Sequence, residues 1–265
     1  MKDSCQEEAT IFLQNPIFAS HTFPSASERE YISVFGLPIY KREMKKCLLT
    51  LKKELSSQKK APTLVFTPNL EMLARAKHSS ETFKLLQKAD LLLPDGIGTQ
   101  ILSGFRVRER IAGIEIGEAL LALSEKEGFR VYLLGGRTGV AENAAERLTA
   151  QFPALSIVGT HHGYFDKREE QAVTAEIRAA SPDLLFVCMG FPLQEEFLVR
   201  NRSSLSPVRI ALGLGGSLDV WAGDLCRAPV WMQRCGLEWL FRTTKEPHRI
   251  KRIFRSIHEI LLPRK

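Results

Sequence analysis

The sequence lacks a hydrophobic run long enough to cross a membrane, because none of its apolar stretches approaches the roughly 20 residues that a transmembrane helix needs. Its N-terminus carries Asp3, Glu7 and Glu8 and no long apolar core, which is unlike a secretory signal. The five cysteines are odd in number and form no CxxC pair, which favours a reducing compartment over a disulfide or zinc framework. We therefore expect a cytoplasmic protein whose membrane contact is peripheral.

Several catalytic signatures are also missing. The chain has no DxD sequence to carry a metal–diphosphate bridge, no GxSxG, no P-loop and no HExxH. The glycine-rich stretch at Gly135, Gly136 and Gly139 does not have GxGxxG spacing, and no suitable acidic residue ends the next expected strand. Dinucleotide binding is therefore weakly supported, and the sequence predicts neither a metal nor a cofactor.

Length and composition are those of a soluble globular protein, with 265 residues of which 44% are hydrophobic and 25% charged. Short apolar runs alternate with segments of helical period, which predicts an open, doubly wound α/β fold with a mostly parallel, Rossmann-like sheet. The expected strands are Ile32–Leu37, Thr63–Thr67, Asp90–Leu93, Arg130–Leu134, Leu155–Val158, Leu184–Met189 and Arg209–Leu212. The expected helices are Glu43–Leu55, Asn69–Lys77, Glu81–Lys88, Ile114–Glu127, Gly139–Gln151, Arg168–Ala180 and Gln194–Asn201.

The charge is distributed unevenly and suggests three parts. Residues 227–265 hold ten Lys/Arg and three Asp/Glu, a balance of +7 that equals the charge of the whole chain, so residues 1–226 are neutral. We expect a poorly ordered extension at 1–30, an α/β domain at 31–226 and a basic helical appendage at 227–265. One apolar stripe at helical period runs through the appendage: Ile250, Ile253, Phe254, Ile257, Ile260 and Leu261. An ordinary packed C-terminal helix and a helix that binds an anionic ligand or bilayer explain this pattern equally well.

Polar residues follow the expected strands at their carboxyl ends, where ligands bind in open α/β sheets. Thr67 and Asn69 can hydrogen-bond a nucleotide, although turn formation and helix capping are at least as common for such residues. Asp95, between Pro94 and Gly96, is a candidate general base, and its ordinary alternative is again a turn or cap.

Other strand ends offer further candidates. Backbone N–H groups of Gly135 and Gly136 can cradle a diphosphate at a helix N-terminus. Gln194 is expected in the first turn of a helix, facing the cleft, whereas Glu195 can simply complement the helix dipole. The adjacent His161 and His162 are expected to be surface loop residues rather than ligands.

In order and spacing, a series of motifs resembles the WecG/TagA/CpsF family of bacterial glycosyltransferases (glycosyltransferase family 26) over roughly residues 33–254. The motifs are Thr67-Pro68-Asn69, Pro94-Asp95-Gly96, Glu109-Arg110-Ile111-Ala112-Gly113, Leu134-Gly135-Gly136, Pro192-Leu193-Gln194-Glu195, Gly215-Gly216-Ser217-Leu218-Asp219, Arg227-Ala228-Pro229 and Gly236-Leu237-Glu238-Trp239-Leu240-Phe241-Arg242. The chain departs from the family in having Leu193 where a lysine is common and Phe241 where a tyrosine is frequent.

The resemblance implies transfer of an N-acetylmannosamine-type sugar from a UDP-sugar to an undecaprenyl-diphosphate-linked GlcNAc acceptor, with inversion and without metal. It implies that Asp95 is the catalytic base. It places a further set of residues around the substrates: Thr67, Asn69, Arg110 and Gln194, with Arg242, Arg249 and Arg252 of an appendage that closes over the diphosphate. The implied partners are the UDP-sugar, the polyprenyl-linked acceptor and an anionic membrane surface at the inner face of the cell membrane.

The chemistry of such a transfer is consistent with these residue types. One carboxylate accepts the proton of the acceptor hydroxyl, and guanidinium groups stabilise the negative charge of the departing UDP in the absence of a DxD motif. We expect the appendage both to bind the membrane and to complete the site. Alternatives are another UDP-hexose donor, a UDP-sugar epimerase or dehydrogenase, and a nucleic-acid-binding protein, which the neutral body disfavours.

Overall fold

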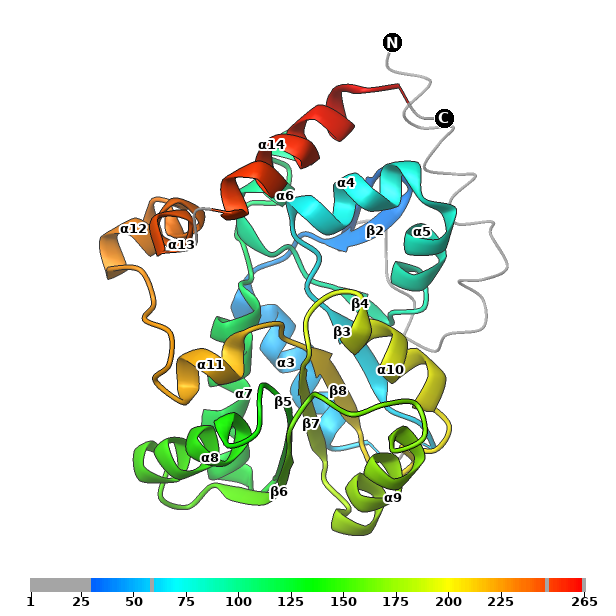
Figure 1. The fold of residues 1–265 in the computed structure, drawn as a ribbon, viewed down its shortest axis with the longest axis vertical. Helices are drawn as coiled ribbons and strands as arrows, with labels where there is room; N and C mark the ends of the chain where they lie inside the picture. The colour runs from blue at the N-terminus through cyan, green and yellow to red at the C-terminus, as the bar shows by residue number, and fades with distance from the viewer. Residues whose placement is uncertain (1–29, 58–59, 246–247, 264–265) are drawn as a thin grey trace.

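The computed structural model describes residues 30–57, 60–245 and 248–263. Within these ranges the chain forms a sheet of eight strands in the order β1-β2-β4-β3-β8-β7-β5-β6 (Figure 1). The strands are β1 (Tyr31–Val34), β2 (Leu37–Tyr40), β3 (Thr63–Phe66), β4 (Leu91–Leu92), β5 (Arg130–Gly135), β6 (Ser156–His161), β7 (Leu184–Cys188) and β8 (Ile210–Gly213). All neighbouring strands except β1 and β2 pair in parallel, which confirms the predicted α/β class with a mostly parallel sheet.

The first expected strand, Ile32–Leu37, is wrong in detail. The chain reverses at Phe35 and Gly36, both with positive φ, and the two arms pair antiparallel as β1 and β2. A two-residue turn with both φ angles positive matches the twist of a hairpin. Glycine accommodates this conformation readily, whereas phenylalanine rarely does, so the residue types gave little indication of the turn.

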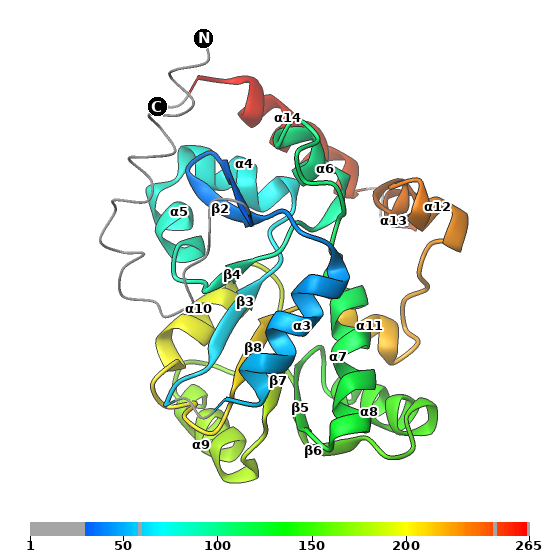
Figure 2. The ribbon, with the colours of Figure 1, turned by 180° about the vertical axis from the view of Figure 1, so that it is seen from behind.

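Helices cover both faces of the sheet (Figures 1 and 2). One face packs against α3 (Met44–Leu55), α7 (Gly113–Glu127), α8 (Val140–Gln151) and α11 (Ser217–Trp221). The other packs against α4 (Leu70–His78), α5 (Ser80–Leu86), α9 (Glu170–Ala180) and α10 (Leu193–Asn201). The seven expected helices are present within a few residues of their predicted bounds, whereas α6 (Gly96–Leu102) and α11 were not predicted.

The strand order creates a topological switch point at the carboxyl edge of the sheet. Strands β5 and β7 are neighbours, but β5 leads into α8 on one face and β7 leads into α10 on the opposite face. Ligands of doubly wound sheets bind at such a switch point. The loops after β3, β4 and β8 emerge along the same edge, because these strands are parallel to β5 and β7.

Three helices follow α11: α12 (Val230–Arg234), α13 (Glu238–Lys245) and α14 (His248–Leu261). Helix α14 packs along α4, and α4 also contacts α6. Two side chains near the end of α4 bind backbone carbonyls of the α14 segment. Lys77 donates to the carbonyls of Ile260, at 2.6 Å, and Leu262, and His78 Nε2 lies 2.6 Å from that of Glu259.

Candidate active site

Thr67 joins the ends of two neighbouring strands. It follows β3, is buried, and donates from Oγ1 to the carbonyl of Gly213 at the end of β8, at 3.1 Å. A Cβ at Gly113, the first residue of α7, would lie 3.2 Å from the same oxygen. The hydroxyl thus sits at the meeting point of β3, β8 and α7, within the carboxyl edge where the sequence placed it.

Asn69 has the capping role that the sequence left open. It occupies the N-cap of α4, where its Oδ1 accepts the backbone N–H of Met72 at 3.1 Å. That bond satisfies one of the otherwise unpaired donors of the first helical turn. The amide nitrogen of the same side chain remains chemically suited to donate to a ligand.

Asp95 lies directly beside this segment. It follows β4 at the N-cap position of α6, but its side chain makes no capping hydrogen bond. Its backbone N–H donates to the carbonyl of Pro68 at 3.3 Å, and Thr99 Oγ1 lies 3.2 Å from the same carbonyl. The Thr67–Asn69 and Pro94–Gly96 loops are therefore held together through Pro68.

Arg110 lies next to Ile111, which bonds to the Asp95 loop, and its side chain connects the α/β body to the appendage. Ile111 donates its N–H to the carbonyl of Pro94 at 2.8 Å. The Arg110 guanidinium donates to Glu115 Oε1 of α7 and to the carbonyl of Gln233 of α12, each at 3.0 Å. One guanidinium thus contacts both the α/β body and the appendage.

Arg227 shares the same carboxylate oxygen. Its Nη2 lies 3.1 Å from Glu115 Oε1 and 3.7 Å from Glu238 Oε2, and its Nη1 lies 3.8 Å from Glu118 Oε2. Gln233 donates to the carbonyl of Ala228 at 2.6 Å, which links α12 to the turn that contains Arg227. We name Arg110, Glu115 and Arg227 the Glu115 node.

Gln194 lies in the first turn of α10, as predicted, and is buried. Its Oε1 accepts the N–H of Gly215 at 2.9 Å, and its Nε2 donates to Glu195 Oε1 at 2.8 Å. A Cβ at Gly213 would lie only 2.7 Å from Nε2, so the amide is packed directly against the end of β8. Gln194 therefore orients the glycine-rich loop after β8.

Glu195 is more deeply buried than the helix-dipole role considered for it requires. The side chain is fully buried, and burial raises the pKa of its carboxyl group to about 7. Its Oε2 has no hydrogen-bond partner among the described residues. A carboxyl group that titrates near pH 7 is consequently held beside Gln194 and the end of β8.

Gly135 and Gly136 form the crossing at the switch point. A Cβ at Gly135 would lie 2.3 Å from the carbonyl oxygen of Cys188, and its φ of 140° is rare for other residues. Gly136 donates to the same carbonyl at 3.0 Å and accepts from Gly163 at 2.8 Å. The close approach of the strands requires glycine at position 135.

His161 departs from the surface loop expected for it, whereas His162 lies in the segment that follows the strand. His161 is the last residue of β6, which continues beyond the predicted end at Val158, and both side chains are partly buried. Their rings lie 4.5 Å apart between centroids, and Nδ1 of His161 lies 2.7 Å from the His162 carbonyl. The pair thus borders the same carboxyl edge through the contact of Gly163 with Gly136.

The structure describes the side chain of only one of the three candidate arginines of the appendage. Arg252 Nε of α14 lies 4.0 Å from Glu71 of α4. The backbones of Arg242 and Arg249 belong to α13 and α14, whereas their side chains lie outside the described residues. Residues 1–29 of the expected extension also lie outside them, and the domain boundary at 226/227 stays a prediction.

The apolar stripe of α14 divides between two surroundings. Ile253 and Ile260 are partly buried, as is expected from the packing of α14 along α4. Ile250, Phe254 and Ile257 are exposed, and Leu261 is 78% exposed. Packing on the body and an outward apolar face thus occur on one helix, and the two explanations offered by the sequence are compatible.

Contacts connect the sequence-predicted residues into a continuous arrangement. Asp95 bonds to Pro68, which follows Thr67 in the sequence, Thr67 bonds to Gly213, and Gly213 packs on Gln194. Arg110 adjoins through the Ile111–Pro94 bond. Gly135 and Gly136 belong to the neighbouring part of the same edge, across β7. Arg252 contacts the first turn of α4, which Asn69 caps.

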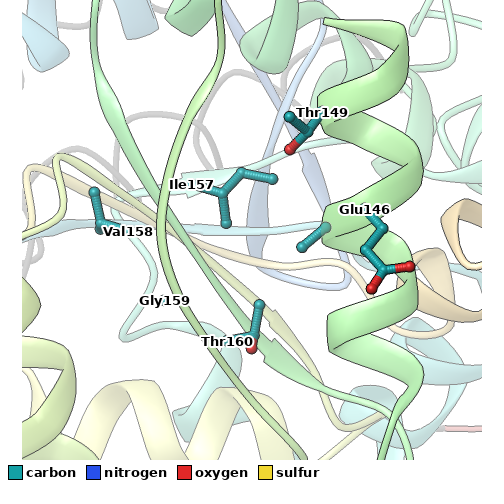
Figure 3. A pocket seen from close by; sticks show the side chains of 7 residues that line it. Glu146, Thr149, Ile157, Val158, Gly159 and Thr160 are labelled. Atoms are coloured by element: carbon teal, nitrogen blue, oxygen red, sulfur yellow. The ribbon is translucent and has the colours of Figure 1, made fainter. Parts of the chain in front are cut away.

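A shallow pocket elsewhere does not include these residues. It lies between α8 and β6 and is lined by Glu146, Thr149, Ile157 and Thr160 among others (Figure 3). In the described ranges, no three His, Cys, Asp or Glu residues group so as to hold a metal ion. No described helix combines the length and apolarity that a membrane crossing requires.

Comparison with known proteins identifies the family. Residues 32–263 match the Glycosyl transferase WecG/TagA/CpsF family. An N-acetylglucosaminyldiphosphoundecaprenol N-acetyl-beta-D-mannosaminyltransferase of Bacillus subtilis (strain 168) is 33% identical over 224 residues, 83% of this chain and 86% of the relative. A protein of the same name from Bacillus spizizenii (strain ATCC 23059 / NRRL B-14472 / W23) is 35% identical over 192 residues, 71% and 74% of the two chains. The chain is therefore a glycosyltransferase and belongs to the WecG/TagA/CpsF family, as its motifs indicated.

Proposed function

We propose that the protein transfers N-acetylmannosamine from UDP-N-acetylmannosamine to undecaprenyl-diphosphate-linked N-acetylglucosamine. The names of the two Bacillus relatives support the donor sugar and the acceptor. The observation that carries the proposal is the joining of the Asp95 and Thr67–Asn69 loops through Pro68, with Arg110 beside them. A carboxylate, hydrogen-bonding side chains and a guanidinium are thereby combined at one edge of the sheet.

The reaction assigns one step to Asp95. Its carboxylate accepts the proton of the acceptor hydroxyl while that oxygen forms a bond to the anomeric carbon. The bond from this carbon to the diphosphate breaks on the opposite face, which inverts the configuration, and UDP leaves with the electron pair. The position of Asp95 supports this role, because the residue lies between β4 and α6 at the carboxyl edge of the sheet.

Cationic side chains balance the charge of the departing diphosphate. Arg110 is one candidate, and Arg242, Arg249 and Arg252 of the appendage are the others. Guanidinium groups suit this role because their planar fork binds two phosphate oxygens and keeps its charge. The chain has no DxD sequence for a metal–diphosphate bridge, so we propose that these arginines act in its place.

The acceptor also defines where the enzyme works. Its lipid carrier lies in a bilayer, and α14 combines the exposed apolar residues described above with three exposed cations, Lys251, Arg252 and Arg255. A cationic helix with an outward apolar face settles into the headgroup region of anionic membranes. We therefore propose peripheral association with the cytoplasmic face of the cell membrane.

The decisive experiment measures sugar transfer from UDP-N-acetylmannosamine to a GlcNAc-diphosphate-lipid acceptor in the presence of EDTA. We expect a lipid-linked disaccharide from the wild type and a rate roughly 100-fold lower for Asp95→Asn. The exposed Asp224 provides a matched control, because Asp224→Asn makes the same chemical change away from the site. Unchanged transfer by Asp95→Asn contradicts the assigned base, and loss of wild-type activity in EDTA contradicts metal independence.

A further inference from the structure

We propose that the α6–Phe105 segment of the catalytic body is a second membrane-contact element, which inserts Ile101 and Phe105 into an anionic phospholipid surface beside α14. We name residues Ile101–Arg108 the Phe105 wedge. This element lies outside the appendage to which membrane binding was assigned above. Its role in placing Asp95 rests on the proposed function, whereas its binding to lipid does not.

The wedge exposes two large apolar side chains that are four residues apart in the sequence. Ile101 is 55% exposed and Phe105 is 67% exposed. Phe105 also has a φ of 57°, in the left-handed region that is sterically unfavourable for a bulky residue. A phenylalanine that is both exposed and strained gains little from the fold itself, and strained positions concentrate at functional sites.

A dense set of hydrogen bonds holds this unfavourable conformation. Phe105 donates its N–H to the carbonyl of Gln100 at 2.8 Å, and the Gln100 amide donates to the carbonyls of Val107 and Arg108 at 3.2 and 3.1 Å. Ser103 Oγ accepts the N–H of Val107 at 3.2 Å, and the Val107 side chain is fully buried. The aromatic ring is thus presented on a rigid loop.

The charged residues near Phe105 indicate which kind of partner this surface binds. Arg106 and Arg108 are both exposed and follow Phe105 in the wedge, on either side of the buried Val107. Helix α6 contacts α4, along which α14 packs, and α14 adds exposed Phe254 with Lys251 and Arg255. Apolar side chains surrounded by cations match a bilayer that has anionic headgroups above an apolar interior.

The wedge is connected rigidly to the candidate base. Helix α6 begins directly after Asp95 and spans seven residues, about 10 Å at 1.5 Å per residue. Gly98 packs on Leu70 of α4, where an added Cβ would lie 2.7 Å from the Leu70 Cβ, and Ile97 packs against Gly236 between α12 and α13. A wedge anchored in the headgroups therefore holds Asp95 at a fixed height above the bilayer, where a lipid-linked acceptor presents its sugar.

The test uses the full-length protein and vesicles of phosphatidylglycerol and phosphatidylcholine, without donor or acceptor. Phe105→Gly removes the ring and suits the left-handed backbone, so we expect its thermal unfolding midpoint to be no lower than that of the wild type. We expect its partitioning into vesicles to fall about tenfold, the effect of losing one inserted aromatic side chain. Leu49→Ala is the matched control, because Leu49 is 55% exposed on α3.

Three outcomes overturn the proposal. In the first, Phe105→Gly partitions into vesicles as well as the wild type does. In the second, Leu49→Ala loses as much partitioning as Phe105→Gly. In the third, the wild type is a dimer that Phe105→Gly dissociates, so that the exposed wedge contacts a second copy of the chain rather than lipid.

A second measurement addresses the placement of Asp95. With a vesicle-embedded acceptor we expect about tenfold slower transfer by Phe105→Gly, in proportion to its lost partitioning, and with a short, water-soluble acceptor we expect the wild-type rate. Equal loss on both acceptors excludes the membrane role. Absence of transfer by the wild type contradicts the proposed function but not the vesicle result.

Discussion

Arg227 contacts Glu115 at 3.1 Å between Nη2 and Oε1, across 112 residues of sequence. The same oxygen accepts from Arg110, whose other contact is a carbonyl of α12. Two guanidinium groups, one from each side of the predicted domain boundary, therefore share a single carboxylate oxygen. The Glu115 node makes the position of the appendage and the orientation of Arg110 interdependent.

Arg227→Ala is accordingly expected to lower sugar transfer about tenfold by misplacing Arg110, and to speed the release of the C-terminal helices by limited trypsin digestion. Arg227→Lys keeps the charge but not the fork, so we expect partial recovery of both properties. Arg200→Ala removes a surface arginine paired with Glu170 and Glu196 on α9 and α10, and serves as the control. Normal transfer combined with faster digestion of Arg227→Ala would restrict the node to a structural role.

The two roles of Asn69 can be separated by the choice of substitution. Asn69→Ala removes the α4 cap and is expected to lower the free energy of unfolding by about 1 kcal/mol, whereas Asn69→Ser keeps a capping oxygen. If the carboxamide also binds substrate, both variants lose transfer activity while only the alanine variant loses stability. Urea unfolding and transfer rates measure the two effects.

Ser79 provides the comparison for Asn69, because its Oγ caps α5 by accepting the N–H of Thr82 at 3.2 Å. Ser79→Ala is expected to cost a similar free energy of unfolding and to leave transfer unchanged. Full activity in Asn69→Ser would show that Asn69 acts as a cap alone.

The buried Glu195 predicts a specific pH dependence of stability. Burial raises the pKa of its carboxyl group from 4.5 to about 7 in the folded state, so the folded protein binds more protons than the unfolded chain between these values. The free energy of unfolding therefore falls as pH rises from about 4.5 to about 7. Above that range the burial of the ionised carboxylate lowers the free energy of unfolding by on the order of 3 kcal/mol.

Glu195→Gln is expected to remove this decline while preserving an acceptor for Gln194. Urea unfolding of wild type and variant at pH values of about 5 and about 8, on either side of most of this titration, measures the difference, which should be larger at the higher pH. Glu196→Gln, at the neighbouring and partly exposed position, is the control. A constant difference between wild type and Glu195→Gln at both pH values contradicts the prediction.

Much of the sheet could be predicted because its strands are short apolar runs bounded by glycine, proline and polar residues. Helix α6 could not, since Gly96 and Gly98 lower its intrinsic helix propensity. Gly98 instead allows the close approach to Leu70 that stabilises the helix by packing. The β1–β2 hairpin was missed for a related reason, because Phe35 adopts a conformation that its residue type disfavours.

Some residues of the candidate site could likewise be predicted from the sequence, and others could not. Thr67, Asn69, Asp95 and Gln194 follow strands, so the sheet rule alone predicted that they share one edge. The pairing of Arg227 with Glu115 was not predicted, because an ion pair between distant residues leaves no pattern in the sequence. Glu195 was recognised only as part of a helix start, and its burial depends on the packing of α10 against β8.

The attachment of α14 has a consequence for how its sequence can diverge. Lys77 and His78 bind backbone carbonyls at positions 259, 260 and 262, which every amino acid possesses. This attachment therefore does not select the side chains of the segment that it holds. Under the proposed membrane role, residues on the outward face of this helix can therefore change to suit a different lipid composition without loss of these bonds to α4.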